Sequence, residues 1–172
     1  MISYKERLPK ITTLMFDIDG VLTDNRIYFF KDEVVRSLHS KDGFALQLAA
    51  KKGYKIFIIT GGKSEEIKSR LLNSGATEVH LHSSNKLAVY DSICKKHGLK
   101  NEEILYMGDD IPDIPVMKLV GMACCPQDAV SDVKSISHYQ SPILGGNGCV
   151  REIIEQVLRV QGKWNIEEDA HW

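Results

Sequence analysis

The sequence lacks an excess of charge of either sign, and it lacks any long hydrophobic run. Its 22 basic and 23 acidic residues give a formal net charge of -1, which provides no electrostatic reason to expect binding to nucleic acid or to an anionic membrane surface. No apolar stretch approaches the length of a membrane-spanning helix, and the N-terminal sequence has no apolar stretch of the signal-peptide type. We therefore expect a cytoplasmic protein that binds neither nucleic acid nor membrane.

The sequence also lacks a cysteine pattern typical of zinc sites or disulfides. None of its four cysteines belongs to a CxxC pair, and Cys124 and Cys125 are adjacent. Reduced, mostly buried cysteines are therefore expected, as in a cytoplasmic protein. The chain has 172 residues, 43% of them hydrophobic and 26% charged, without an internal repeat. These values suit one globular domain with a single core.

Short apolar runs recur along the chain. They are mostly apolar on both sides, as in the strands of a parallel sheet that is covered on both faces. The runs are Ile11–Phe16, Tyr54–Ile59, Glu78–Leu81, Ile104–Met107 and Gly121–Cys125.

Segments with a helical pattern alternate with these runs. They show i, i+4 apolar pairs, N-cap residues and C-terminal glycines. The segments are Phe44–Lys52, Ser64–Gly75, Lys86–His97, Pro112–Val120 and Gly148–Val160. The alternation predicts an α/β fold with a doubly wound, Rossmann-like parallel sheet in the strand order 3-2-1-4-5.

One segment interrupts the alternation. Arg26–Phe30 and Val34–His39 flank Lys31-Asp32-Glu33, which predicts a β-hairpin between the first strand and the first helix, where no cap domain would fit. Its apolar side chains would be costly to leave in water, so we expect the hairpin at a subunit contact. The alternative is a hairpin that folds back on its own domain.

The predicted organisation has three parts. Residues 1–161 form a single domain, the hairpin insertion occupies about residues 26–39, and residues 162–172 form a C-terminal tail. The tail is polar apart from Trp164 and Trp172, and we expect it to be ordered only by docking.

The strongest chemical motif directly follows the first predicted strand. It reads Asp17-Ile18-Asp19-Gly20-Val21-Leu22-Thr23-Asp24, and doubly wound sheets bind ligands at the carboxyl ends of their strands. Asp17 and Asp19 lie on the same side of an extended chain, and Gly20 allows a sharp turn. A divalent cation would offset the repulsion between the carboxylates and neutralise an incoming phosphate, so that one carboxylate can attack and the other can move a proton. Taken alone, the motif could also be an acidic helix cap.

Three further polar segments are expected at the same edge of the sheet. Thr60-Gly61-Gly62 places a hydroxyl and flexible glycines at a helix N-terminus, which can bind an anion. Lys86 can act as a point charge on a phosphoryl oxygen. Gly108-Asp109-Asp110-Ile111-Pro112-Asp113 offers carboxylates suited to Mg²⁺, with Asp109 and Asp113 one helical turn apart. Each segment alone could be a turn, a cap or a surface lysine, but together they supply a nucleophile, an acid, a metal site, a hydroxyl and a cation.

The order of these motifs resembles the haloacid dehalogenase superfamily of phosphotransferases. DxDG, Thr-Gly, Lys and GDDxxD follow one another between about Ile11 and Ala123, with no cap domain between Asp24 and Thr60, which is similar to the capless branch. Within that branch DIDGVLTDNRIYF, SKDG, SNK, GDDIPDIPVM, GGNGCVRE and VQGKW resemble the phosphatases of 3-deoxy-D-manno-octulosonate 8-phosphate. The resemblance implies a Mg²⁺-dependent phosphoric monoester hydrolase of lipopolysaccharide precursor synthesis.

The resemblance also implies roles at matching positions. Asp17 would be the nucleophile that becomes a phospho-aspartate, and Asp19 would be the general acid and base. Asp17, the Asp19 carbonyl and Asp109 would hold Mg²⁺. The resemblance further implies a ring-like homotetramer, in which hairpins assemble a central barrel and a neighbour's tail closes the site.

The remaining implied roles concern a sugar-acid phosphate substrate. The residues implied to bind its phosphoryl group or its carboxylate are Thr60, Gly61, Lys86 and, for the carboxylate, Arg70. The sequence departs from the family where an arginine commonly follows Thr-Gly, because Gly62 stands there, followed by Lys63. It also departs in the GGRG loop, which has Asn147 in place of arginine.

Two other functions remain open from the sequence. A phosphatase for a nine-carbon, sialic-type acid 9-phosphate would share every catalytic motif. A non-catalytic oligomerisation module would share the fold, but it would have no need of an acid at Asp19.

Overall fold

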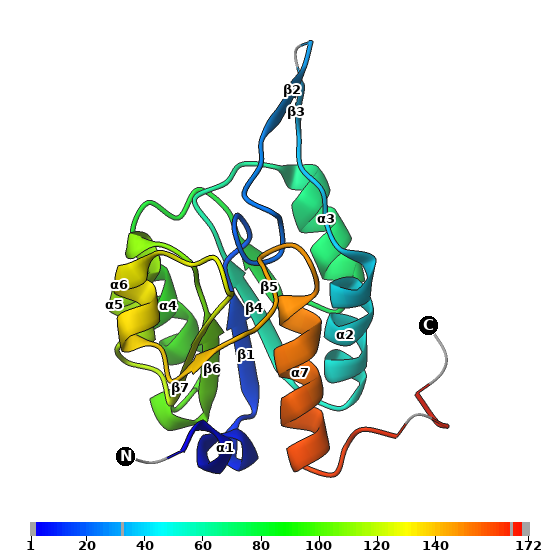
Figure 1. Cartoon of the computed structure of the whole chain (residues 1–172), viewed down its shortest axis with the longest axis vertical. Coiled ribbons are helices and arrows are strands. Elements are labelled where there is room, and N and C mark those ends of the chain that lie inside the picture. Colours follow the sequence, from blue (N-terminus) through cyan, green and yellow to red (C-terminus); the bar gives the residue numbers. More distant parts are fainter. Residues whose placement is uncertain (1–2, 32, 166, 170–172) are drawn as a thin grey trace.

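Six parallel strands form one sheet at the centre of the molecule (Figure 1). The structure is a computed structural model that describes residues 3–31, 33–165 and 167–169. In sheet order the strands are β5 (Glu78–His80), β4 (Lys55–Ile59), β1 (Thr13–Phe16), β6 (Ile104–Met107), β7 (Met122–Cys125) and β8 (Tyr139–Gln140). The first five are the strands predicted from the sequence, so the fold class and the order 3-2-1-4-5 are confirmed.

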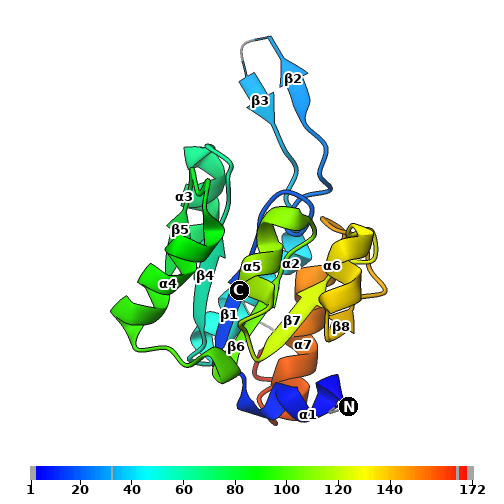
Figure 2. The same cartoon turned by 90° about the vertical axis from the view of Figure 1, so that its left-hand side faces the viewer.

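Helices cover both faces of this sheet (Figures 1 and 2). One face carries α2 (Ser40–Lys51), α3 (Glu65–Asn73) and α7 (Cys149–Val160), and the other carries α4 (Lys86–His97), α5 (Ile114–Met117) and α6 (Ser131–Ile136). Successive strand residues enter opposite cores, so that Leu14 and Phe16 pack beneath α2 and α7 while Met15 packs beneath α4 and α5. Burial on both faces explains why the strands read as continuous apolar runs. Within the described residues, every helix is too short or too polar to span a membrane.

Several element boundaries differ from the prediction. Helix α2 begins at Ser40 rather than at Phe44, directly after the extended residue His39. The helix expected over Pro112–Val120 is a 3₁₀ turn, η3 (Ile111–Asp113), followed by the short α5, because its prolines lack the N–H groups that a continuous helix needs. The short elements that sequence patterns missed are α1 (Tyr4–Arg7), η1 (Leu8–Lys10), η2 (Asn101–Glu103), α6 and β8.

The predicted hairpin projects away from the domain (Figures 1 and 2). Strands β2 (Tyr28–Phe30) and β3 (Glu33–Val35) pair only with each other in an antiparallel ribbon. Phe29 and Phe30 are 79% and 71% exposed. The alternative in which the hairpin folds back on its own domain is therefore wrong, and an apolar surface of the hairpin faces outward in the single chain.

The described part of the tail lies against its own chain. The guanidinium groups of Arg151 and Arg159 lie 4.7 Å and 5.2 Å from the centre of the Trp164 ring, and Asp169 forms an ion pair of 2.8 Å with Lys52 at the end of α2. Trp172, the other aromatic residue expected to dock, lies outside the described residues.

Candidate active site

The four predicted motifs meet at the carboxyl edge of the sheet. Strand β1 pairs with β4 on one side and β6 on the other, so Asp17 at the end of β1 lies between the segments that follow those two strands. Thr60 follows β4 and Asp109 follows β6, and Lys86 opens helix α4. All four side chains are buried, with 2–7% of each residue exposed. The parallel register therefore explains how motifs far apart in the sequence form one site.

Lys86 joins two of the carboxylates. Its ammonium group lies 2.9 Å from Oδ2 of Asp17 and 2.6 Å from Oδ1 of Asp113. A buried ammonium that donates to two carboxylates is held as a charged group, and the negative charges around it raise the pKa of Lys86 against the opposing effect of burial. The surface-lysine alternative for Lys86 is therefore wrong.

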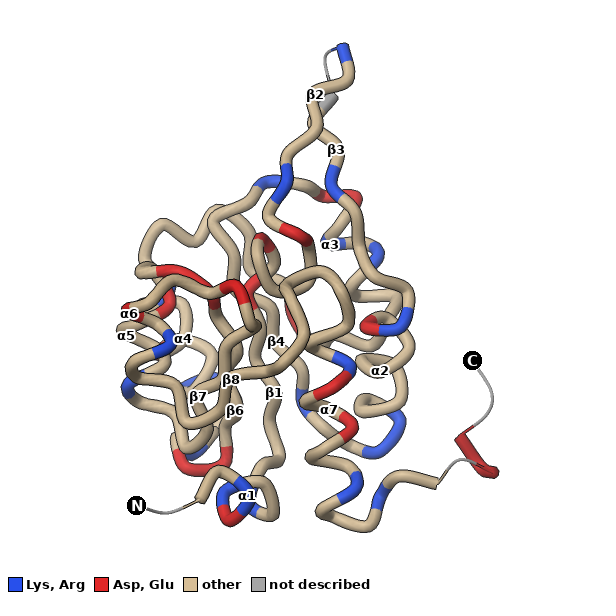
Figure 3. The backbone as a smooth tube through the Cα atoms, viewed as in Figure 1, with Lys and Arg blue, Asp and Glu red and all other residues tan. Residues whose placement is uncertain are grey.

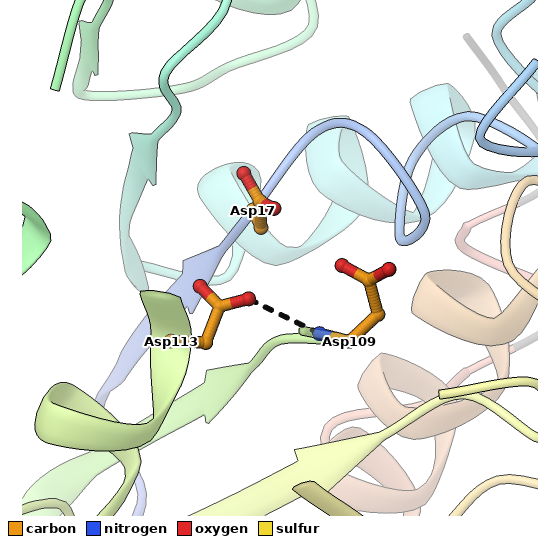
Figure 4. Close-up of side chains that lie close together, drawn as sticks. All are labelled: Asp17, Asp109 and Asp113. Carbon is orange, nitrogen blue, oxygen red and sulfur yellow. Dashed lines mark hydrogen bonds between the residues drawn. The ribbon is translucent and has the colours of Figure 1, made fainter. Parts of the chain in front are cut away.

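Asp113 organises the loop that follows β6 (Figure 4). Its Oδ1 accepts a hydrogen bond from the Tyr106 hydroxyl at 2.6 Å in addition to the Lys86 contact. Its Oδ2 accepts the backbone N–H groups of Asp109 at 3.2 Å and Asp110 at 3.4 Å. Both oxygens of this fully buried carboxylate thus have protein partners. Sequence reasoning placed Asp113 beside Asp109 in a segment suited to Mg²⁺, but it did not foresee the contacts with Lys86 and the loop. It missed Tyr106, whose hydroxyl in an apolar strand was the available signal, because buried hydroxyls need partners.

Asp17 and Asp109 have carboxylate oxygens without partners. Oδ1 of each is buried and has no hydrogen bond among the described residues. Burial and, after it, the negative charges of the neighbouring carboxylates raise the pKa of Asp17 to about 7 and that of Asp109 to about 8, against the opposing effect of Lys86. One oxygen from each of Asp17, Asp109 and Asp113 lies within 4.8 Å of the other two. Buried, mutually repelling carboxylates with unpaired oxygens fit a divalent cation, which offsets their charge.

The turn of the DxDG motif packs directly on this acidic group. Gly20 has φ of +90°, and a Cβ there would lie 2.0 Å from Oδ2 of Asp109. Only glycine provides both the left-handed backbone and the close approach. The loop that carries Gly145 and Asn147 closes over the same turn, since a Cβ at Gly145 would lie 2.0 Å from the Gly20 carbonyl oxygen. The absence of a side chain at Gly20 and Gly145 therefore allows Asp109, the turn after β1 and the Gly145 loop to pack closely together.

Asp19 is held by its own set of hydrogen bonds. Its Oδ1 accepts a hydrogen bond from Nε of Arg36 at 2.7 Å and one from the Thr23 hydroxyl at 3.3 Å. Its Oδ2 faces Gly62, where a Cβ would lie 3.6 Å away. The Gly62 N–H donates to the Thr60 hydroxyl at 3.0 Å. Sequence reasoning missed Arg36, whose contact with Asp19 arises only when the hairpin returns to the domain.

A large cavity opens beside Asp19. It has a volume of about 760 Å³ and lies between the base of the hairpin and the start of α3. Its lining residues are Val34, Val35, Arg36, Gly61, Gly62, Lys63, Ser64, Glu66 and Ile67. A smaller pocket with many of the same residues reaches Asp19 and Thr60. The cavity offers space for the part of a substrate that follows the reacting group.

Arg70 lies apart from the aspartates within this chain. It is exposed on α3 and lines a separate cavity of about 100 Å³ with His39 and with residues of α2, among them Asp42. Burial raises the pKa of Asp42 to about 6, although its carboxylate accepts the Arg151 backbone N–H at 2.6 Å. The structure thus unites Asp17, Asp19, Thr60, Lys86 and Asp109, with Gly61 beside them, but not Arg70.

Comparison with known sequences finds phosphatases among the relatives of this chain. Residues 40–121 match the family model of the haloacid dehalogenase-like hydrolases. The 3-deoxy-D-manno-octulosonate 8-phosphate phosphatase KdsC of Escherichia coli K12 is 34% identical over 154 residues, which are 89% of this chain and 82% of that protein. KdsC of Yersinia pestis is 31% identical over 159 residues, which are 92% of this chain and 85% of that protein.

Solved structures agree with the sequence relatives. The 3-deoxy-D-manno-octulosonate 8-phosphate phosphatase of Yersinia pestis superposes with a TM-score of 0.90 at 30% identity and covers 93% of this chain and 87% of that one. The enzyme of the same name from Moraxella catarrhalis was solved in complex with magnesium ion, phosphate ion and a KDO molecule. It superposes with a TM-score of 0.92 at 26% identity, and the match covers 97% of both chains.

Proposed function

Because this chain belongs to the haloacid dehalogenase-like hydrolases, in the family of the 3-deoxy-D-manno-octulosonate 8-phosphate phosphatases, we propose that it is a Mg²⁺-dependent phosphatase. The substrate is 3-deoxy-D-manno-octulosonate 8-phosphate, and the products are the free sugar acid, a precursor of lipopolysaccharide, and phosphate. The observation that carries this proposal is the buried group at the carboxyl edge, where Asp17 and Asp109 keep unpaired oxygens beside the Lys86 ammonium.

Asp17 is the nucleophile of the first step. One of its carboxylate oxygens forms a bond to phosphorus while the bond between phosphorus and the sugar oxygen breaks, which gives a phospho-aspartate. Lys86, 2.9 Å from Asp17, is placed to offset negative charge on the transferring group. The Thr60 hydroxyl and the Gly61 N–H bind phosphoryl oxygens at the end of β4, in the loop that leads to helix α3.

Asp19 moves the proton in both steps. It donates a proton to the departing sugar oxygen, and it then takes a proton from the water that attacks the phosphorus of phospho-Asp17. The second step restores the Asp17 carboxylate and releases phosphate. Because Oδ1 of Asp19 is held by Arg36 and Thr23, Oδ2 remains available for this proton.

Asp17, Asp109 and the carbonyl oxygen of Asp19 would hold Mg²⁺. When bound, the ion neutralises charge that would otherwise oppose the approach of a phosphate monoester to two carboxylates. Asp113 is unsuited to be a ligand, since both of its oxygens accept hydrogen bonds from the protein. Its function is to hold Lys86 and the Asp109 loop in place.

The hairpin supports a homotetramer. Its exposed apolar side chains, Phe29 and Phe30 above all, are of the kind that a subunit interface covers. In this assembly the C-terminal tail, residues 162–172, closes a neighbour's site. Light scattering coupled to size-exclusion chromatography tests the proposal, and a monomer with full activity would contradict it.

The cytoplasm is the proposed location. The support is the cysteine pattern, since adjacent Cys124 and Cys125 suit reduced thiols better than disulfides. Cell fractionation with antibody detection tests this location, and recovery from a periplasmic fraction would contradict it.

A substrate screen tests the function. We expect kcat/KM for 3-deoxy-D-manno-octulosonate 8-phosphate to exceed that for nine-carbon sugar-acid 9-phosphates and for generic sugar phosphates, in the presence of Mg²⁺. Neither the nine-carbon substrate nor the non-catalytic module is favoured by the relatives found. A higher kcat/KM for a nine-carbon sugar-acid 9-phosphate would make that compound the substrate instead. Failure to release phosphate from any ester would exclude a phosphatase function.

A further inference from the structure

Arg36 connects the hairpin to the reacting groups. It directly follows β3, and its side chain is 13% exposed although the hairpin above it is largely open to solvent. Figure 3 shows basic positions where the hairpin joins the domain, above acidic positions in the loops at the edge of the sheet. Arg36 therefore makes its ion pair at the junction between the two parts of the molecule.

The contact with Asp19 fixes one carboxylate oxygen and leaves the other available. Nε of Arg36 donates to Oδ1 at 2.7 Å, and the Thr23 hydroxyl donates to the same oxygen at 3.3 Å. Oδ2 lies on the side of Gly62 and therefore of Thr60, to which Gly62 is hydrogen-bonded. Charge-assisted hydrogen bonds from a guanidinium are strong and directional, so Arg36 determines which way Asp19 presents its second oxygen.

We propose that Arg36 is a positioning residue, which holds Asp19 in the orientation required to protonate the leaving oxygen. The inference rests on the proposed function, because it requires Asp19 to be the acid and base. Arg36 acts through Asp19, whereas Lys86 acts on the phosphoryl group itself. Since Arg36 belongs to the base of the hairpin, the orientation of the acid depends on where the hairpin sits.

The nature of the leaving group separates this role from a direct contact with substrate. An alkoxide leaves with difficulty unless it is protonated, whereas an aryl oxide leaves readily without a proton. A misplaced acid should therefore slow the transfer from an alkyl phosphate much more than from an aryl phosphate. Both esters lack a carboxylate, so loss of a contact between Arg36 and the sugar acid would leave this ratio unchanged.

The experiment compares kcat/KM for alkyl and aryl phosphates in Arg36→Met, which keeps the apolar stem of the side chain without its charge. The quantity kcat/KM reports only on steps up to departure of the alcohol, so a slow second step does not affect it. We expect a loss of about 10–10²-fold with the alkyl ester, the range produced by misplacing a reacting group by an ångström. The loss with the aryl ester should be much smaller. Arg36→Lys should recover part of the alkyl activity.

Two controls complete the design. Arg26→Met removes the arginine at the other end of the hairpin base, which is exposed and makes no side-chain ion pair within the described residues, and it should behave as wild type. In an Asp19→Asn background, Arg36→Met should have no further effect, because the two residues act as one unit. Size-exclusion chromatography of each variant shows whether the assembly is retained.

The possible results are distinct. Equal losses with both esters, or an additive effect in the Asp19→Asn background, would overturn the positioning role. A loss confined to the sugar-acid phosphate would overturn it in favour of a direct substrate contact. A wild-type enzyme that releases no phosphate from any ester would instead refute the proposed function.

Discussion

Replacing Asp113 by asparagine is expected to lower stability as well as activity, although the substitution preserves shape. The carboxylate accepts hydrogen bonds from Lys86, the Tyr106 hydroxyl and the backbone N–H groups of Asp109 and Asp110. Asparagine has an NH₂ group in place of one of the two carboxylate oxygens, and this group cannot accept a hydrogen bond. At least one of the buried donors therefore loses its partner.

Two opposing effects determine the magnitude. Breaking a buried ion pair costs about 3–5 kcal/mol, and we expect the lower end because Lys86 keeps its contact with Asp17. In the other direction, removing the Asp113 charge relieves the repulsion that raises the pKa of Asp17 and Asp109. Mg²⁺ already offsets that repulsion, so with Mg²⁺ bound the loss of about 3 kcal/mol should dominate and lower Tm by about 6–12 °C.

Thermal unfolding in saturating Mg²⁺ measures this effect. Asp110→Asn is the matched control, because Asp110 is exposed and its role as an N-cap is performed equally well by asparagine. Its Tm should remain close to that of wild type. An Asp113→Asn protein as stable as wild type in Mg²⁺ would refute the view that Asp113 holds Lys86 and the Asp109 loop.

Three further outcomes are expected. Asp17→Asn should abolish Mg²⁺-dependent phosphate release, because an amide cannot attack phosphorus; residual turnover of more than a few per cent would exclude the nucleophile. Lys86→Met should reduce kcat/KM for every phosphate ester to a similar degree, as judged by steady-state kinetics, and an unchanged value would contradict its contact with the phosphoryl group. The Tm increase produced by Mg²⁺ should grow from pH 6 to pH 8.5. The pKa values of Asp17 and Asp109 are raised in the metal-free fold from 3.8 to about 7 and about 8. Metal-free stability therefore falls as the pH rises toward these values and levels off above them, and Mg²⁺ removes that penalty. A Tm increase that is constant across this range would contradict the assignment.

The strands and the main site residues could be predicted because their signals are local. Four of the five predicted strands are apolar runs buried on two faces, the exception being β5. Asp17 and Thr60 directly follow such runs, and Asp109 comes after one with only Gly108 between. Parallel pairing then places these residues at one edge without further information. By contrast, β8 has two residues, too few for any periodicity to be recognised.

The contacts that organise the site could not be predicted, since they join elements that are distant in sequence. Arg36 reaches Asp19 only because the chain leaving β3 re-enters the domain beside the DxDG loop. The Tyr106 hydroxyl and Lys86 meet on one oxygen of Asp113 only because the fold brings the first residue of α4 to the loop that follows β6. Such contacts depend on side-chain direction in the folded state rather than on spacing along the chain.

Chemical trapping of the phosphorylated enzyme tests the central claim most directly. The wild-type protein is mixed with substrate and Mg²⁺, quenched in acid during turnover, treated with borohydride to reduce any acyl phosphate, and mapped by mass spectrometry. The expected result is reduction at Asp17, dependent on Mg²⁺ and absent from Asp17→Asn. Substrate turnover with Asp17 unmodified throughout, or with the label on Asp19 or Asp109 instead, would contradict the phospho-aspartate at Asp17.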